Sequence, residues 1–346
     1  MSIQDRRIRS LVVTNMWPTP AVPGTGTFVR DRVDSLRAAG VEVEVLYFPR
    51  TEGRSVYRGL GRKVAAAAAE RQPDVVHVMY GGVMAEAVTR SVRGRPIVVS
   101  FCGSDLLGGR GAGLVERLSL RYGVLASRRA ARRAAGVIVM SRNLHDALPA
   151  AVSRDRTWIV PDGVDFSRFR PLDRARCRAE LGWDGDRRHV LFPALRSRPE
   201  KRYALAEATV EALNAEGHAV DLHALENVPH ADVPVWLNAA NAVLLTSAHE
   251  GSTNVVKEAL ACDVAVVSVD VGDARERLAG IEGCFVADAV PEDLAAKLSA
   301  ALANGERVAG RASIRDLALD RTAARVAEIY REVIDGGGGE ALLRRS

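Results

Sequence analysis

The amino-acid sequence predicts an α/β protein with two domains in tandem, each built on a parallel β-sheet that helices cover on both faces. Three observations lead to this fold class. The 346 residues exceed the length of about 150 that is typical of one domain. Short apolar runs rich in β-branched residues alternate with amphipathic helical patterns, as they do in parallel sheets. The alternation starts again after a stretch punctuated by Pro161, Gly163 and Pro171.

Each half of the chain contains a series of expected strands. In the first half, where a helix is also expected over 28–40, the strands are residues 9–17, 41–48, 74–80, 95–103 and 135–141. In the second half they are residues 188–195, 219–225, 241–247, 264–271 and 284–288. The domain boundary is expected within residues 160–173, which gives domains of residues 1–165 and 170–318. A last amphipathic helix is expected over 320–335.

Charge and cysteine content exclude several classes of function. The net charge of +5 and the pI near 9.2 suit an anionic ligand or a membrane surface, but no nucleic-acid motif accompanies the charge, so we predict no nucleic-acid partner. The four cysteines are far apart and form no CxxC pair, which indicates neither a disulfide scaffold nor a zinc site. No apolar run approaches the ~20 residues of a membrane span, and we expect a cytoplasmic protein.

The segment HEGSTNVVKE, residues 249–258, carries the clearest chemistry. It joins an expected buried strand to an expected helix, so its polar part lies at the carboxyl end of a parallel strand, where open α/β sheets bind ligands. The N–H groups of the first helical turn, from about Ser252 to Val255, favour an anion. Glu250 and Glu258 accept hydrogen bonds and suit sugar hydroxyls. A nucleotide sugar, with its ribose, diphosphate and hexose, meets all of these requirements.

The alternative for this segment is a capped surface helix on which Lys257 and Glu258 are solvated. A second loop favours the binding site. The segment LRSRPEKRY follows another expected strand and offers Arg196, Arg198 and Lys201, the positive charge that a departing diphosphate needs. Lysine is rare in this arginine-rich chain, which makes Lys201 unusual. No DxD motif stands where a metal would bridge a diphosphate, so no metal is expected in the site.

Taken together, these segments resemble the group 1 retaining glycosyltransferases of family GT4. Their most specific block is residues 236–272, in which E-x7-E spans the turn from strand to helix. The other blocks are PTPAVPGTGTFVRDRVDSLRAAGVEVEVL, RPIVVSFCGSD, AAGVIVMS, TWIVPDGVDFSRFRP and LRSRPEK. The resemblance implies the GT-B fold, in which two Rossmann-like domains face a central cleft. It also implies that residues 1–165, completed by the helix 320–335, bind the acceptor and that residues 170–318 bind the nucleotide sugar.

The resemblance further implies roles for individual residues. Arg196 and Lys201 would bind the donor diphosphate and stabilise the leaving group. Glu258 would hold the ribose diol, and Glu250 the hydroxyls of the transferred sugar. The implied donor is a UDP-sugar, with GDP-mannose as the second choice. The sugar would pass to an acceptor hydroxyl with retention of configuration and without a metal or other cofactor, in polysaccharide or glycoconjugate biosynthesis. The acceptor would be a sugar, a lipid-linked molecule or a small molecule.

Backbone groups complete the site that the resemblance implies. The backbone that would lie against the sugar and the distal phosphate belongs to Gly251, Ser252, Thr253 and Asn254. Gly24 and Gly26 match the loop after the first strand, where a missing side chain allows close approach to donor or acceptor. An ordinary turn between strand and helix is the alternative for each of these two glycines.

The segment SFCGSD departs from the family pattern. The family commonly has histidine where this chain has Cys102, so the role of that histidine is open; a small buried residue is the alternative for this cysteine. Asp105 matches the family and is a candidate for contacting the acceptor or the sugar. His249 and His77 are each interpreted either as a proton-transfer group or as a local hydrogen-bonding residue.

The basic stretch from Arg117 to Arg133 has two interpretations. It suits peripheral contact with an anionic membrane at its inner face, which would bring a lipid-linked acceptor to the enzyme. It equally suits a solvated face in an arginine-rich protein.

Two other classes of function stay open at this point. One is a nucleotide-sugar epimerase of related fold, and the other is a sugar-binding two-domain protein without activity. An NAD-dependent oxidoreductase is disfavoured, because GTGTF does not supply the GxGxxG pattern that binds a dinucleotide.

Overall fold

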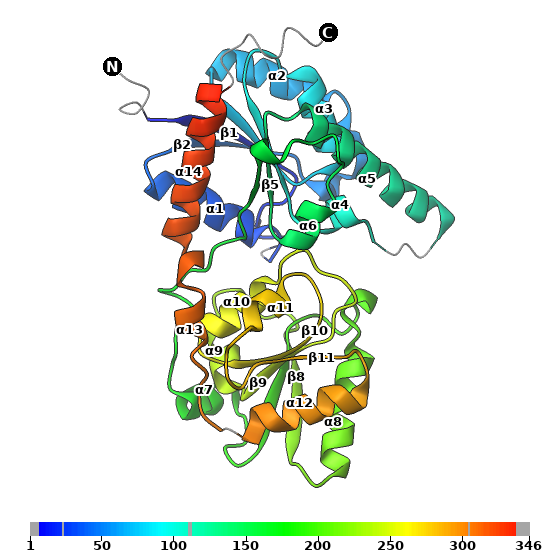
Figure 1. The fold of residues 1–346 in the computed structure, drawn as a ribbon, viewed down its shortest axis with the longest axis vertical. Coiled ribbons are helices and arrows are strands. Elements are labelled where there is room, and N and C mark those ends of the chain that lie inside the picture. Colours follow the sequence, from blue (N-terminus) through cyan, green and yellow to red (C-terminus); the bar gives the residue numbers. More distant parts are fainter. Residues whose placement is uncertain (1–6, 23, 110–112, 304, 337–346) are drawn as a thin grey trace. The chain divides into compact units, whose positions relative to one another are not determined.

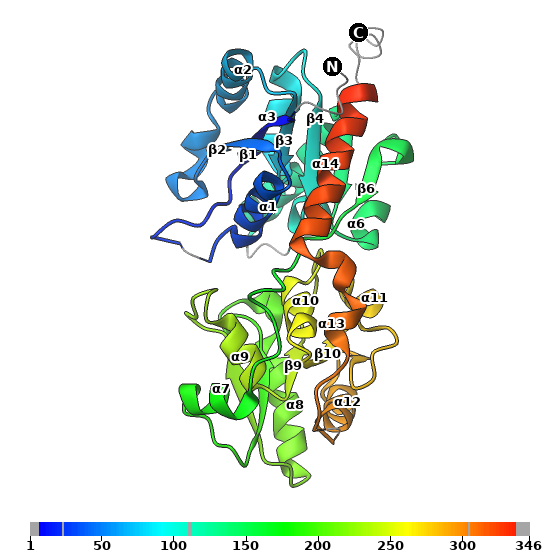
Figure 2. The ribbon, with the colours of Figure 1, turned by 90° about the vertical axis from the view of Figure 1, so that its left-hand side faces the viewer.

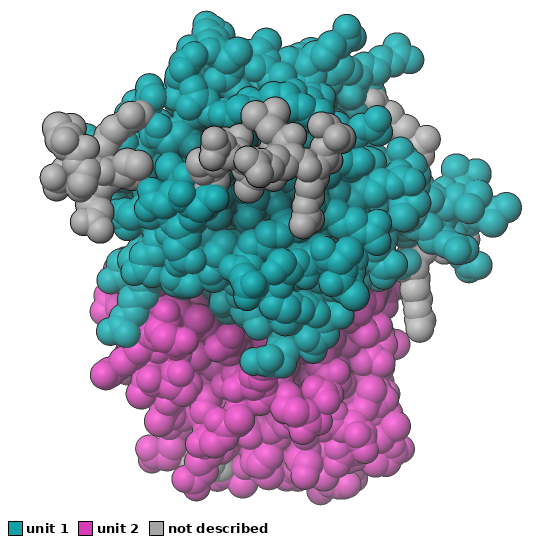
Figure 3. All heavy atoms as spheres, turned by 45° about the horizontal axis from the view of Figure 1, so that its top comes forward, with its two compact units in different colours: residues 1–163, 319–346 teal, residues 164–318 magenta. Residues whose placement is uncertain are grey.

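The computed structural model describes residues 7–22, 24–109, 113–303 and 305–336. The chain divides into two compact units, coloured separately in Figure 3. Unit 1 comprises residues 1–163 and 319–346, and unit 2 comprises residues 164–318. The change of unit falls between Gly163 and Val164, because the Val164 amide donates to the Leu317 carbonyl at 2.8 Å and so joins unit 2.

Unit 1 is a six-stranded parallel sheet in the order β2-β1-β3-β4-β5-β6, and its strands are labelled in Figures 1 and 2. Its strands are β1 (Arg9–Thr14), β2 (Glu42–Tyr47), β3 (Val75–Met79), β4 (Ile97–Phe101), β5 (Gly136–Val139) and β6 (Thr157–Ile159). Every residue of β3, β4 and β5 is buried, as expected of strands that helices cover on both faces. The strand β6 was not expected from the sequence, because its three residues form too short a run and none of them is buried.

The helices of unit 1 follow the strands and cover the sheet. They are α1 (Thr27–Ala38), α2 (Leu60–Arg71), α3 (Gly82–Ser91), α4 (Ser104–Leu107), α5 (Leu114–Arg133) and α6 (Arg142–Asp146), with the 3₁₀ segments η2 (Arg50–Tyr57) and η3 (Arg154–Arg156). The last helix of the chain, α14 (Leu319–Gly336), packs against α1 (Figures 1 and 2). Its buried Tyr330 lies with its hydroxyl 2.6 Å from Nδ1 of His77 on β3.

Unit 2 is a five-stranded parallel sheet in the order β11-β10-β9-β7-β8. Its strands are β7 (Arg188–Phe192), β8 (Val220–Ala224), β9 (Ala242–Leu245), β10 (Ala265–Val269) and β11 (Phe285–Ala287). Its helices are α7 (Arg174–Leu181), α8 (Tyr203–Ala215), α9 (Val233–Ala239), α10 (Asn254–Ala261), α11 (Ala274–Leu278), α12 (Pro291–Ala303) and α13 (Gly310–Ser313), with 3₁₀ turns η4 (Pro199–Lys201) and η5 (Arg315–Leu317). The predicted fold class, α/β with two parallel sheets, is confirmed.

Each sheet has one point where the strand order reverses. In unit 1 the chain goes from β1 to β2 on one side and then to β3 on the other; in unit 2 it goes from β7 to β8 and then to β9. Loops at such a point separate and leave room for a ligand at the carboxyl ends of the strands. The loop containing Lys201 follows β7, and the loop containing Glu250 follows β9. The topology therefore places both loops at the reversal point of unit 2.

Within the described ranges, no helix combines the length and the apolar character needed to span a bilayer.

Candidate active site

Two loops of unit 2 bring a cation against a carboxylate. Lys201 ends η4, after β7, and Glu250 lies in the loop after β9. Nζ of Lys201 is 2.5 Å from Oε1 of Glu250, and the two side chains are 19% and 18% exposed. The structure thus joins the residue assigned to phosphate with the residue assigned to sugar. Because both remain in reach of solvent, a ligand can contact them.

Hydrogen bonds between the two loops fix the position of Lys201. The Thr246 hydroxyl donates to the Lys201 carbonyl at 2.8 Å, and the Ala248 amide donates to the Glu200 carbonyl at 2.8 Å. Arg202, which has a left-handed backbone with φ of 54°, donates from Nε to the Thr246 carbonyl at 2.5 Å. The backbone that carries the lysine is therefore held at the end of β9.

A second carboxylate of the motif pairs with a histidine. Oε1 of Glu258, on α10, is 3.2 Å from Nε2 of His230, and Nδ1 of His230 is 3.1 Å from Nη1 of Arg168. Because the guanidinium can only donate, Nδ1 accepts and Nε2 carries the hydrogen that Glu258 receives. The sequence did not indicate His230 or Arg168 as site residues. The signal for His230 was its place in the polar loop after β8, at the same edge of the sheet.

Asp273 holds the start of α10 in place through hydrogen bonds. Its carboxylate accepts from the Thr253 amide at 3.1 Å, from the Ser252 hydroxyl at 2.8 Å and from Nε of Arg277 at 3.0 Å. Burial raises the pKa of Asp273, but Lys257 and Arg277 outweigh this effect and hold the pKa below its usual value. One first-turn amide expected to face an anion is therefore already bonded.

Lys257 corrects the interpretation of HEGSTNVVKE as a solvated surface helix. This lysine is fully buried, and its Nζ lies 3.2 Å from the Ser252 hydroxyl. The side-chain oxygen of Asn254, at the start of the same helix, is buried and has no hydrogen-bond partner among the described residues. A buried acceptor of this kind favours a ligand that brings a donor, as a sugar hydroxyl does.

The contacts of Arg196 are with Glu226 and Tyr203. Its backbone amide donates to Oε1 of Glu226 at 3.0 Å, and its Nε is 3.5 Å from Oε2 of the same residue. The guanidinium lies over the ring of Tyr203, 5.1 Å from the centroid, and the side chain is about half exposed. Arg196 thus contacts the loop after β8, and its contact with a diphosphate stays a prediction. Gly251 is buried in the same loop as Glu250, where His249 is partly exposed.

Gly24 and Gly26 differ in the space around them. Gly26 precedes α1 with φ of 74°, and a Cβ built there would lie 2.5 Å from the Met16 carbonyl carbon. Only glycine fits this position, because the added atom would collide with backbone. Gly24 has no heavy atom within 4 Å of a Cβ built on it. Close packing within unit 1 therefore explains Gly26 and gives no reason for Gly24.

Asp105 fixes two loops of unit 1 through the backbone. Its carboxylate accepts from the amides of Gly81 and Gly103, each at 2.8 Å, and from the amide of Cys102 at 3.1 Å. The residue is only 5% exposed, and burial raises the pKa of its carboxyl despite these amides. This geometry favours a positioning role over the contact with acceptor or sugar that the sequence suggests. Desolvation and the Asp105 carboxylate also raise the pKa of the Cys102 thiol well above its usual value.

His77 is a buried hydrogen-bonding residue in this structure. Its Nδ1 contacts the Tyr330 hydroxyl at 2.6 Å and its Nε2 contacts the Ser100 hydroxyl at 2.7 Å. Burial, with a smaller effect of Arg32, lowers the pKa of His77 to about 3. The ring is therefore neutral near pH 7 and links β3, β4 and α14.

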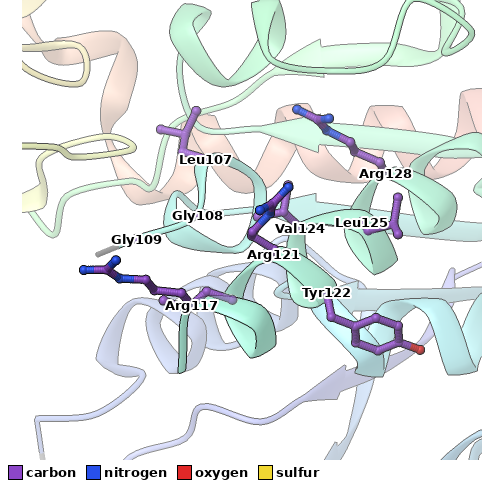
Figure 4. A pocket seen from close by; sticks show the side chains of 10 residues that line it. Leu107, Gly108, Gly109, Arg117, Arg121, Tyr122, Val124, Leu125 and Arg128 are labelled. Carbon is purple, nitrogen blue, oxygen red and sulfur yellow. The ribbon is translucent and has the colours of Figure 1, made fainter. Parts of the chain in front are cut away.

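The helix α5 presents both basic and apolar side chains to solvent. Its first turns expose Leu114 by 74%, Val115 by 71% and Leu118 by 55%. In Figure 1 this end of α5 extends away from the rest of unit 1. An open hollow of about 910 Å³ lies between α5 and the segment that follows α4, as Figure 4 shows from close by. Its lining includes Leu107, Arg117, Leu120, Arg121, Val124, Leu125 and Arg128.

Comparisons with known proteins define the class of this protein. The family model described as Glycosyltransferase Family 4 matches residues 5–168, and that described as Glycosyl transferases group 1 matches residues 195–304. A D-inositol 3-phosphate glycosyltransferase of Thermobispora bispora is 28% identical over 220 residues, which cover 52% of this chain and 51% of that protein. This chain spans about half the length of the first curated relatives it matches.

Solved structures share the fold. Sucrose-phosphate synthase from Thermosynechococcus elongatus has a TM-score of 0.78 at 18% identity, covering 96% of this chain and 100% of that chain. Anabaena HepE in complex with UDP has a TM-score of 0.66 at 18% identity, covering 94% of this chain and 100% of that chain. The fold is therefore GT-B, and the chain belongs to the group 1 glycosyltransferases of family 4.

Proposed function

We propose that this protein transfers a sugar from a nucleotide-sugar donor to an acceptor hydroxyl. The observation that carries the proposal is the Lys201–Glu250 pair at the point where the strand order of unit 2 reverses. A donor replaces this single ion pair by two interactions: its diphosphate takes the ammonium of Lys201, and a sugar hydroxyl donates to Glu250. The lysine then stabilises the charge that develops on the departing diphosphate.

Glu258 and Asn254 extend the site along α10. The ribose diol takes the place of His230 at Glu258, since both are hydrogen-bond donors to the carboxylate. The side-chain oxygen of Asn254, which has no partner among the described residues, accepts a further hydroxyl. Gly251, Ser252 and Thr253 supply the backbone beside the sugar and the distal phosphate.

A UDP-sugar is the donor we favour, and GDP-mannose is the second choice. Support comes from HepE, which was solved in complex with UDP and with UDP-glucose. The proposed reaction retains the anomeric configuration and needs no metal, which agrees with the lack of a DxD motif at the site. The proposed acceptor is a sugar, a lipid-linked molecule or another small molecule that offers a hydroxyl.

Donor binding is tested by thermal unfolding in the presence of UDP-, GDP-, dTDP- and ADP-sugars. A ligand that binds the folded protein raises Tm by mass action, by an amount that increases with ligand concentration. We expect the shift with UDP-sugars in the wild type and its loss in Lys201→Ala and Glu258→Ala. A shift that survives both substitutions contradicts the site, and a panel without any shift contradicts the donor class.

Turnover separates transfer from the alternatives. The expected product is a glycosylated acceptor with the anomeric configuration of the donor, seen by NMR. Isomerisation of the donor without acceptor would indicate an epimerase, and binding without turnover a sugar-binding protein. Activity should persist in EDTA; its loss, with rescue by Mg²⁺, contradicts the metal-free reaction.

We also propose that α5 contacts an anionic membrane surface. Its exposed Leu114, Val115 and Leu118 lie on the same helix as arginines that attract anionic lipid headgroups. Sedimentation with vesicles tests this: we expect binding to phosphatidylglycerol vesicles and not to phosphatidylcholine. The double variant Leu114→Gln/Val115→Gln should lose this binding, whereas Val290→Gln, which alters an exposed valine of unit 2, should keep it. Equal binding by both variants contradicts the proposal.

A further inference from the structure

Two histidines and an aspartate meet on the strands β7 and β8. His189 is at the amino end of β7, whereas Lys201 follows the carboxyl end of that strand. In the parallel register His189 lies opposite Asp221 on β8, the edge strand of the sheet, and His223 follows two residues later on the same face. One ligand atom from each of the three residues lies within 4.8 Å of the others.

A hydrogen bond determines which nitrogen of His189 carries the hydrogen and which one presents a lone pair. Nε2 of His189 is 2.6 Å from the Asp184 carbonyl, which can only accept, so Nε2 carries the hydrogen. Nδ1 therefore presents a lone pair, and it lies 2.9 Å from Nε2 of His223. A backbone carbonyl that orients the distal nitrogen of an imidazole is the outer contact found around metal-bound histidines.

The distances between the three ligand atoms suit a small metal ion. In a tetrahedron with metal–ligand bonds of 2.0–2.1 Å, neighbouring ligand atoms are about 3.3 Å apart. Here Nδ1 of His189 is 2.9 Å from Nε2 of His223 and 3.8 Å from Oδ2 of Asp221, so the two distances lie on either side of that value. The Asp221 side chain is 35% exposed, which leaves room for a water molecule as the fourth ligand.

Neighbouring side chains decide which metals fit. Nε of Arg187 donates to Oδ2 of Asp221 at 2.7 Å and partly neutralises the carboxylate. A hard ion such as Mg²⁺ depends on carboxylate charge and is disfavoured, whereas late transition metals bind imidazole well. Trp183 stacks on His223 with a centroid separation of 3.7 Å, so an indole reports directly on this imidazole.

We propose that His189, Asp221 and His223 form a binding site for a divalent late transition metal, with Zn²⁺ as the physiological ion. The metal takes the place of the hydrogen between the two imidazoles. Nε2 of His223 gives up this hydrogen, which passes to Nδ1 of the same ring, so that the protein releases no net proton. The site connects the edge strand β8 to β7 and is independent of the proposed sugar transfer.

The test uses full-length protein without a histidine tag, stripped with EDTA and then exchanged into chelator-free buffer. Zn²⁺ stoichiometry is measured by equilibrium dialysis. Ni²⁺ is titrated while tryptophan fluorescence is followed, because this paramagnetic ion quenches an indole stacked on its ligand. We expect one Zn²⁺ per chain, saturable quenching that Zn²⁺ reverses, and with Co²⁺ the visible spectrum of a tetrahedral site.

Matched variants distinguish the site from binding to other histidines. His223→Gln and Asp221→Asn should each weaken Zn²⁺ binding at least 10-fold. His218→Gln removes an exposed histidine just before β8 and should bind as the wild type does. Circular dichroism shows whether the variants fold. Absence of saturable binding, or equal loss in His218→Gln, overturns the proposal, while failure of the donor shift alone bears only on sugar transfer.

Discussion

The carboxyl edges of the two sheets use carboxylates differently. In unit 2, Glu250 binds the side chain of Lys201, and both groups remain about one-fifth exposed. In unit 1, Asp105 is 5% exposed and binds three backbone amides. A pair of side chains opens when a ligand offers a partner to each, whereas a carboxylate that leaves its amides exposes them unpaired. The edge of unit 2 can thus exchange its contacts for a ligand, and that of unit 1 keeps its loops fixed.

The largest expected effect concerns the carboxyl edge of the unit 2 sheet, where Lys201 can exchange Glu250 for a ligand. Lys201→Ala should lower kcat/KM for sugar transfer about 100- to 1000-fold, the loss typical for one group that stabilises a developing negative charge. Its Tm should change little, because a partly exposed ion pair contributes only about 1 kcal/mol or less. The quantities to measure are initial rates of nucleotide release and thermal unfolding.

Arg198→Ala provides the matched control for this prediction. Arg198 is a cation of the same loop, is 54% exposed and pairs with Glu200. Its substitution should leave the rate within about 2-fold of the wild type. Equal losses in the two variants would mean that the loop needs only its overall charge, and the proposed contact of Lys201 with the diphosphate would fail.

The next largest effect concerns the carboxyl edge of the unit 1 sheet, where Asp105 fixes the loops. Asp105→Ala leaves three amides without an acceptor and should cost about 3 kcal/mol of folding free energy. Urea unfolding measures this loss as a lower midpoint, with Ser104→Ala as the control because it removes only an exposed hydrogen bond to Tyr80. If Asp105→Ala instead keeps the midpoint and lowers kcat, then Asp105 contacts substrate, as the sequence suggests, and the contrast between the edges disappears.

The sequence predicts the strands well and the contacts of the site only in part. The run that becomes β9 is entirely apolar, and those that become β3 and β4 each contain a single polar residue, so burial on both faces is visible in their composition. The joining of the loops after β7 and β9 follows from the strand order, which no single segment contains. The hydrophobic periodicity of the sequence cannot predict that Arg196 contacts Glu226, because Glu226 lies in a third loop, the one after β8. The buried Lys257 likewise interacts electrostatically with Asp273, which lies outside the motif.

Two glycines in the loop after β1 test whether backbone packing fixes the carboxyl edge of the sheet in unit 1. Gly26→Ala should cost about 2 kcal/mol, because the new Cβ collides with the backbone of Met16 and the residue has φ of 74°. Gly24→Ala should leave the urea midpoint unchanged, since its Cβ meets open space. Equal midpoints for the two variants would show that the loop after β1 yields to the added atom.

Acid should weaken unit 1 through its buried histidine. His77 has its pKa lowered to about 3, while in the unfolded chain it titrates near 6.5, so between these values the unfolded state binds more protons. The stabilising effect is complete above pH 6.5 and is lost as the pH falls towards 3, by at most about 1.4 kcal/mol per pH unit. Urea midpoints at pH 7, 6 and 5 measure this slope. His77→Asn, which cannot titrate, should show a flatter slope than the wild type. An unchanged slope would assign the acid sensitivity to other groups, such as His223 of unit 2, whose pKa burial lowers to about 4.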